Sequence, residues 1–164
     1  MPNTSVFTGA DGSITLSVPQ GTEGERAQEV LDAFQTINVG RVQNVRVEVH
    51  SEIRAFNEIG QRYATQLRPG NIAVRGTIGR AYINGAMLRL LLGEAADSRP
   101  AASWTQPAFN ITLLVENSAT PGINNTITLH DVKLDTWTYG MPEDDFVMES
   151  VGFQALYMTT ADAA

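Results

Sequence analysis

The chain has 164 residues, no cysteine and a net charge of −7 at pH 7, and 43% of its residues are hydrophobic. This length and apolar content suit one domain with a real core and argue against global disorder. The missing cysteine excludes disulfides and thiolate metal sites, and the acidic balance argues against a dedicated nucleic-acid binder. No apolar run is long enough to span a membrane and no signal peptide is visible. We therefore expect no membrane insertion, and a chain made in a cytoplasm or released from one by lysis.

The N-terminal fifth predicts an arm, a strand and a helix. Residues 1–12 are polar and glycine-rich, which indicates a flexible N-terminal arm. Apolar and polar residues alternate over 13–18, which predicts a short strand. Apolar residues at helical spacing then predict a helix over about 22–35, with Thr22 opening a capping box and Gly24 as a weak point.

The stretch from Val45 to Ile83 predicts a β-meander. Its first strand, 45–54, alternates apolar and charged residues, and this period of two gives it one apolar and one polar face. We expect a second strand over 62–68, a turn at Pro69-Gly70 and a third strand over 72–83. A strand this long, with a charged face, usually needs another chain beside it, so self-assembly is the first hypothesis. We expect four of its side chains to face water or a neighbouring subunit rather than the core: Arg46, Glu48, Glu52 and Arg54.

The C-terminal half predicts a short helix and three more strands. The helix follows Asn84-Gly85 and ends at Gly93, and a loop covers 94–107. The strands are expected at 109–116, at 126–139 with a bend near His130-Asp131, and at 146–158 with a bulge or close backbone approach at Gly152, before a frayed end at 159–164.

The whole pattern predicts a mainly β (α+β) single domain over 1–164. Strands follow one another instead of alternating with helices, which favours an antiparallel β-sandwich or barrel flanked by one or two short helices.

The sequence offers few residues for catalysis or metal binding. His50 lies on a polar strand face, and His130 and Asp131 are adjacent in a strand, so their side chains should point to opposite faces. Glycines in Gly76-Thr77-Ile78-Gly79 are better explained by a close neighbouring backbone than by a phosphate loop. Glu143-Asp144-Asp145 indicates a solvated acidic turn. We expect no catalytic residue, no cofactor and no metal.

Four aromatic residues could serve as stacking platforms for bases or sugars: Trp104, Trp137, Phe56 and Tyr63. Without a basic groove around them, core or subunit packing is the stronger interpretation. Phe56 and Ile59 favour an interface, because they lie in a connection where an isolated domain would prefer polar residues.

Five segments carry a pattern of strands and glycines that extends over most of residues 39–158: Val45-Arg46-Val47-Glu48-Val49, Phe56-Asn57-Glu58-Ile59-Gly60, Leu67-Arg68-Pro69-Gly70, Gly76-Thr77-Ile78-Gly79-Arg80-Ala81-Tyr82-Ile83-Asn84-Gly85 and the final Val147-Met148-Glu149-Ser150-Val151-Gly152-Phe153-Gln154-Ala155-Leu156-Tyr157. Together these segments resemble the tail tube proteins of tailed bacteriophages.

This resemblance implies a structural subunit of the virion tail, assembled in the bacterial host cytoplasm. Six copies would form a ring with a continuous β-barrel as its inner wall, and rings would stack into a hollow conduit for DNA. The extended loop 54–62 would reach the next ring or subunit, with an interface formed by Arg54, Phe56, Asn57, Glu58, Ile59, Arg62 and Tyr63.

The resemblance also implies partners. A tape-measure protein would fill the lumen, baseplate and tail-terminator proteins would close the ends, and a sheath protein would surround a contractile tail. DNA would pass without sequence-specific binding along an acidic wall that repels phosphate.

Three alternatives remain at the level of sequence. A type VI secretion-like tube subunit would have the same kind of fold. A monomeric small-ligand-binding β-barrel would use the aromatic residues to line a pocket. An enzyme would need two facing carboxylates, and nothing in the sequence places two of them together.

Overall fold

The computed structural model describes residues 6–35 and 39–163. Those residues confirm the predicted fold class: antiparallel strands dominate and two short α-helices flank them. In chain order the elements are η1 (Gly9–Asp11), β1 (Gly12–Ser17), α1 (Thr22–Phe34), β2 (Val42–Phe56), β3 (Gln66–Ala81), α2 (Ala86–Leu92), η2 (Gly93–Ala96), β4 (Phe109–Glu116), β5 (Asn124–Gly140), β6 (Met148–Ala155) and β7 (Tyr157–Ala163).

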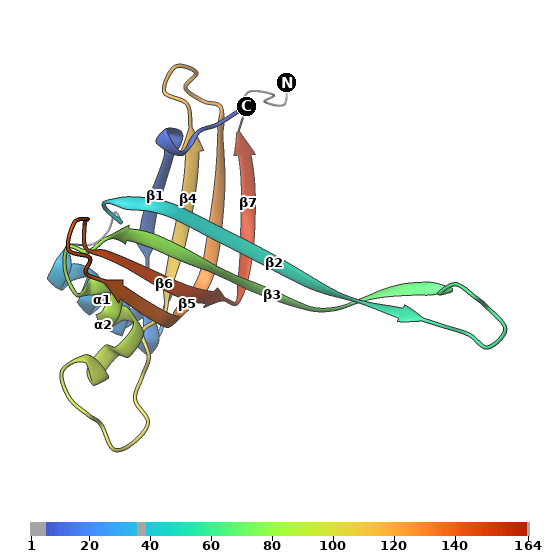
Figure 1. The fold of residues 1–164 in the computed structure, drawn as a ribbon, viewed down its shortest axis with the longest axis horizontal. Coiled ribbons are helices and arrows are strands. Elements are labelled where there is room, and N and C mark those ends of the chain that lie inside the picture. Colours follow the sequence, from blue (N-terminus) through green and yellow to red (C-terminus); the bar gives the residue numbers. More distant parts are fainter. Residues whose placement is uncertain (1–5, 36–38, 164) are drawn as a thin grey trace.

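The strands form one sheet that folds over on itself. Its order is β1-β4-β5-β6-β3-β2, and β7 pairs with β5. The long strand β5 belongs to both halves, because residues 124–130 pair with β7 and residues 133–140 pair with β6. The chain turns between them at Asp131, whose φ is 52°. The predicted bend is therefore confirmed, and in Figure 1 β2, β3 and β6 cross in front of β1, β4 and β7.

The core lies between the two halves of the sheet and under the helices. Helices α1 and α2 lie together at the end of the sheet away from the β2–β3 hairpin (Figure 1). Most of the core is apolar. Its buried side chains include Leu16, Leu31, Ile78, Met87, Leu90, Phe109, Ile111, Leu129, Leu134, Val151 and Phe153.

The predicted three-stranded meander is wrong, because residues 66–81 form one strand. Pro69 and Gly70 lie inside β3, and Pro69 pairs with Ile53 of β2. A register shift between Ser51 and Ile53 accommodates the extra residue of β3. Proline is tolerated at such an irregularity, and long-range pairing with β2 overrides the local turn signal.

The structure corrects the predicted start of helix α1 and explains the glycine near it. Helix α1 has the expected bounds, but Gly21 is its N-cap and Thr22 is its first residue, so the predicted capping box is absent there. Gly24 is buried, and a Cβ there would collide with the carbonyl oxygen of Pro19. Gly24 therefore lets the chain pack closely before the helix. Residues 1–5 of the expected flexible N-terminal segment lie outside the described residues.

The C-terminal end also differs from expectation. The predicted strand 146–158 is two strands, because the chain turns at Leu156, whose backbone N–H donates to the carbonyl of His130 at 3.0 Å. The expected frayed end is wrong: β7 pairs with β5 from His130↔Tyr157 to Asn124↔Ala163. One side of β7 faces solvent, which accounts for its polar side chains. No helix among the described residues is long and apolar enough to cross a membrane.

Candidate assembly interface

Strands β2 and β3 continue far beyond the body of the molecule as a two-stranded ribbon. We call residues 49–73, with the connection between the strands, the arm. At its base Val74 is buried, while Val49 opposite it is already half exposed. Figure 1 shows that no other element lies against the outer half of the ribbon. An isolated two-stranded hairpin is only marginally stable in water, so this geometry calls for a partner.

One face of the arm is apolar and uncovered. Val45 and Val47 pack against the core, and the same face continues outward along both strands. Its outer members are between 49% and 69% exposed: Val49, Ile53, Leu67 and Ile72. A contiguous exposed apolar surface of this kind marks an interaction site in a soluble protein.

The opposite face is polar, as the alternation predicts. Arg46, Glu48 and Arg54 are exposed, and Glu52 is half-buried. The Arg54 Nε donates to Glu52 Oε1 at 2.9 Å. None of the four side chains enters the core, so this prediction is confirmed.

The connection at the end of the arm, residues 56–65, brings the predicted interface residues together. We call it the tip. The backbone N–H of Thr65 donates to the carbonyl of Phe56 at 2.9 Å and closes the connection. Ile59 is fully exposed, and Tyr63 and Phe56 are 83% and 55% exposed. Asn57, Glu58 and Arg62 are exposed beside them, and Arg54 lies two residues before the tip. Their role as an interface stays a prediction.

Four strands form a sheet segment with an unpaired edge on each side. Their order is β2-β3-β6-β5, where β5 contributes residues 133–140. Among the described residues, β2 pairs only with β3, and residues 136–140 of β5 pair only with β6. Strand β2 alone leaves a 15-residue edge. Unpaired edges of this length are templates for pairing with another chain.

The polar face of this segment is not acidic. An open groove of about 490 Å³ runs over it, and its charged lining residues are Arg46, Glu48, Arg75 and Asp135. Two arginines thus balance two carboxylates. Gly76 and Gly152 lie in the same region, where an added Cβ would meet the Phe153 ring or the Asp135 carboxylate. At Gly76 an added Cβ would also meet the carbonyl oxygen of Arg46, so the predicted close backbone approach is confirmed there. At Gly152 the close neighbours are side chains, those of Asp135 and Thr136, and the irregularity lies in the opposite strand, between Leu134 and Thr136.

A buried ion pair was not anticipated from the sequence. Arg80 and Glu149 are both 2% exposed and their side chains form a direct hydrogen bond. Trp137 Nε1 donates to the second Glu149 oxygen at 2.9 Å. The alternation along β3 could have predicted that Arg80 is buried, because Arg80 lies an even number of residues from the core residues Val74 and Ile78 and so falls on the same face of the strand.

The two histidines lie in different surroundings. His50 is exposed, whereas His130 stacks on Tyr157 and its Nε2 lies 3.0 Å from Thr159 Oγ1. Within residues 6–35 and 39–163, no three His, Cys, Asp or Glu side chains gather closely enough to hold a metal ion. Trp137 packs by stacking on Tyr139 with ring centroids 5.5 Å apart, while Trp104 is 44% exposed.

Known proteins resemble this chain in structure but not in sequence. No family model matches it, and no curated protein matches it. The chain is similar to a chain of the sheath–tube complex of an extracellular contractile injection system, PVC, in the extended state, with a TM-score of 0.66, 8% identity and coverage of 97% and 93% of the two chains. It is also similar to the SPP1 tail tube, with a TM-score of 0.60, 11% identity and coverage of 96% and 80%.

The chain has the tail tube fold. A third similar structure is the tube-terminating cap of the anti-feeding prophage, with a TM-score of 0.67, 10% identity and coverage of 99% and 95%. The tail tube fold thus spans nearly the whole chain in each comparison. Identities this low establish the fold alone.

Proposed function

We propose that this chain is a structural, non-enzymatic subunit of a virion tail tube. Six copies close into a ring, and rings assembled in the host cytoplasm stack into a hollow conduit for DNA. The observation that carries this proposal is that the single chain is incomplete: it leaves both edges of the β2-β3-β6-β5 segment unpaired and the apolar face of the arm uncovered. The tail tube fold supports the same conclusion.

Ring closure would satisfy the unpaired edges. The β2 edge of one copy would lie beside the β5 edge of the next, so four strands from each copy would join a continuous barrel without edges. An apolar groove of about 690 Å³ lies beside β2, between it and β1, β4 and β5, and its lining includes Val45, Leu113, Val115 and Ile127. A strand added to β2 would cover this groove, which adds apolar burial to the new backbone hydrogen bonds.

The polar face would then line the lumen. Balanced charges on Arg46, Glu48, Arg75 and Asp135 provide no basic track along which phosphates would be held. DNA would therefore pass without sequence-specific binding, although the wall is mixed in charge rather than acidic. The same lumen would hold a tape-measure protein before DNA release.

The similar structures suggest further partners. Their descriptions name a sheath–tube complex, a tube-terminating cap and a baseplate. For this chain we infer contacts with baseplate and tail-terminator proteins at the ends of the tube, and with a sheath if the tail contracts. A type VI secretion-like tube would use the same ring. A monomeric ligand-binding barrel has less support, because the sheet does not close and both edges stay open.

Negative-stain electron microscopy of the purified protein, together with its light-scattering mass, tests the proposal. We expect rings or hollow filaments with six-fold symmetry. A particle with the mass of one chain, at every concentration and after addition of preformed baseplate or cap as an initiator, would overturn it.

A further inference from the structure

The end of the molecule away from the arm carries a second exposed apolar surface. It comprises five side chains around the ends of β3, β5 and β6, which we call the aromatic end: Tyr82, Ile83, Tyr139, Met141 and Phe146. Met141 and Phe146 are the most exposed of the five, at 71% and 76%. Tyr82 and Tyr139 pack edge to face with ring centroids 5.0 Å apart, and the Tyr82 N–H donates to the carbonyl of Val147 at 2.9 Å. These contacts join the three segments into one surface.

The aromatic end rests on a fixed support. Tyr139 stacks on Trp137, and Trp137 donates to the buried Glu149 that pairs with Arg80. The Arg80 Nη2 atom is buried and has no acceptor among the described residues. Tyr82 and Tyr139 are thus held by ring contacts above a buried ion pair, and side chains already held in place lose less entropy on binding.

The aromatic end and the outer arm differ in charge. Residues 141–147 contain three carboxylates, Glu143, Asp144 and Asp145, and no basic residue. Residues 52–68 contain three arginines, Arg54, Arg62 and Arg68, against two glutamates, and Arg54 already pairs with one of them, Glu52. This basic excess stands out in a chain whose net charge is −7. Each region also presents large apolar side chains, so the two match in both charge and polarity.

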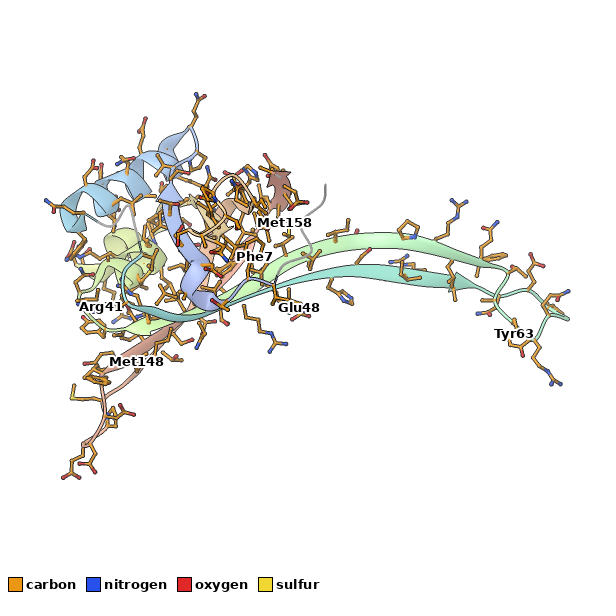
Figure 2. The ribbon with its side chains drawn as sticks, turned by 90° about the horizontal axis from the view of Figure 1, so that it is seen from above. Phe7, Arg41, Glu48, Tyr63, Met148 and Met158 are labelled. Carbon is orange, nitrogen blue, oxygen red and sulfur yellow. The ribbon has the colours of Figure 1, made fainter. Side chains whose placement is uncertain are left out.

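The two regions lie at opposite ends of the molecule. Figure 2 shows Tyr63 at the end of the arm and Met148, which follows the acidic loop, at the other extreme. A single copy therefore cannot bring its own tip to its own aromatic end. Contact between two such different surfaces is head-to-tail, and head-to-tail contacts generate rings or filaments.

We infer that the aromatic end of one copy receives the arm tip of another copy. Ile59 and Tyr63 pack against Tyr82, Met141 and Phe146, and Arg62 and Arg68 face the carboxylates of residues 143–145. The inference rests on the proposed tube and adds the receiving surface for the arm.

Photo-crosslinking tests the contact directly. Ile59 is replaced by benzoylphenylalanine, light and heavy isotopic copies are mixed, and crosslinked peptides are identified by mass spectrometry. We expect crosslinks between copies to fall within residues 139–148, and the same probe at Trp104 to react elsewhere. Crosslinks from position 59 only to other segments, or none between copies, would overturn the inference.

Charge exchange provides a second readout on the same sample. Arg62→Glu and Asp144→Arg should each lower the yield of this crosslink by about fivefold or more, because like charges then meet. The double variant, which exchanges the two charges, should recover most of the yield, whereas Arg99→Glu on the loop before β4 should leave it unchanged. Equal yields in all four variants would overturn the charge pairing.

The crosslinking result for this contact can be distinguished from the microscopy result that tests the proposed tube. Hollow six-fold particles with crosslinks outside residues 139–148 would keep the tube and remove the inferred receiving surface. Crosslinks at 139–148 without hollow particles would keep the head-to-tail contact and remove the tube.

Discussion

At the scale of single residues, packing depends on a few side chains that alternation alone does not identify. The Arg80–Glu149 pair is buried to 2% exposure at both partners, and Trp137 satisfies the second carboxylate oxygen. Charges in such an environment are tolerated only because each neutralises the other. Gly24 is a second residue on which packing depends, because the carbonyl of Pro19 occupies the space that a side chain at position 24 would need.

Glu149→Gln should strongly destabilise the chain. The substitution keeps the shape of the side chain but leaves the Arg80 charge buried without a counterion, which costs about 3–5 kcal/mol. Urea denaturation of the unassembled chain measures the free energy of unfolding. Glu29→Gln is the matched control, because its exposed ion pair with Arg26 should contribute very little. A loss equally small for both variants would show that the buried pair is not structural.

Gly24→Ala should destabilise the chain, although the same change inside a helix normally stabilises it by about 1 kcal/mol. The new methyl group must displace the backbone of Pro19, so we expect a net loss of about 1–3 kcal/mol. Thermal unfolding followed by circular dichroism gives the sign. Gly9→Ala is the control, since a Cβ there meets nothing within 4 Å. A higher melting temperature for Gly24→Ala would contradict the close packing.

At the scale of elements, one apolar face runs along β2 and β3: its inner part packs against the core, and its outer part, on the arm, is uncovered. The two strands pair from Val42↔Arg80 to Phe56↔Gln66, with one irregularity in the arm between Ser51 and Ile53 and another in the body between Val42 and Asn44. The outer half contributes little to the folded body, so substitutions there should separate assembly from folding.

Ile53→Lys combined with Leu67→Lys should abolish assembly without unfolding the body. Both side chains are more than half exposed in the single chain, so charging them costs little stability, but the charges would be buried in an assembled interface. Light scattering should report a single-chain mass and circular dichroism an unchanged sheet signal. His50→Lys, on the polar face of the arm, is the control and should still assemble. Normal particles from the double variant would show that this face is not an interface.

Most elements could be predicted from local patterns, and the exceptions share a physical cause. Helices α1 and α2 and strands β1, β2, β4 and β5 lie where periodicity, glycine caps and alternation placed them. Pro69-Gly70 and the segment after Tyr157 were misassigned, because pairing with a distant strand decided their structure. The tip residues lie together at the connection between β2 and β3, and their role as an interface stays a prediction. Arg80 and the aromatic end could be found only from the register of β3, β5 and β6.

At the scale of the whole molecule, the sheet of a single chain is open. The half-barrel has unpaired edges at β2 and β5, and an apolar groove beside β2. Assembly would change the solvent exposure of these regions while leaving the helices and the inner core as they are.

Hydrogen exchange should therefore distinguish the free chain from the assembled one. We expect amides of residues 49–72 and 136–140 to gain protection on assembly, because edge groups gain partners and local opening of the arm is suppressed. Amides of α2 serve as an internal reference, since their hydrogen bonds lie within the helix. Equal protection of the arm in both states would contradict strand addition at these edges.

The continuous pairing of the arm also determines how it would carry mechanical load. A pull at the tip along the strands would pass into β2 and β3 together, and from β3 into β6 through eight residue pairs, Val74↔Ala155 to Ala81↔Met148. Hydrogen bonds that lie across the direction of the pull are loaded in shear, so they resist together instead of opening one after another. A loop of the same length would stretch under tension, whereas this ribbon would act as a stiff tie between neighbouring subunits of the proposed tube.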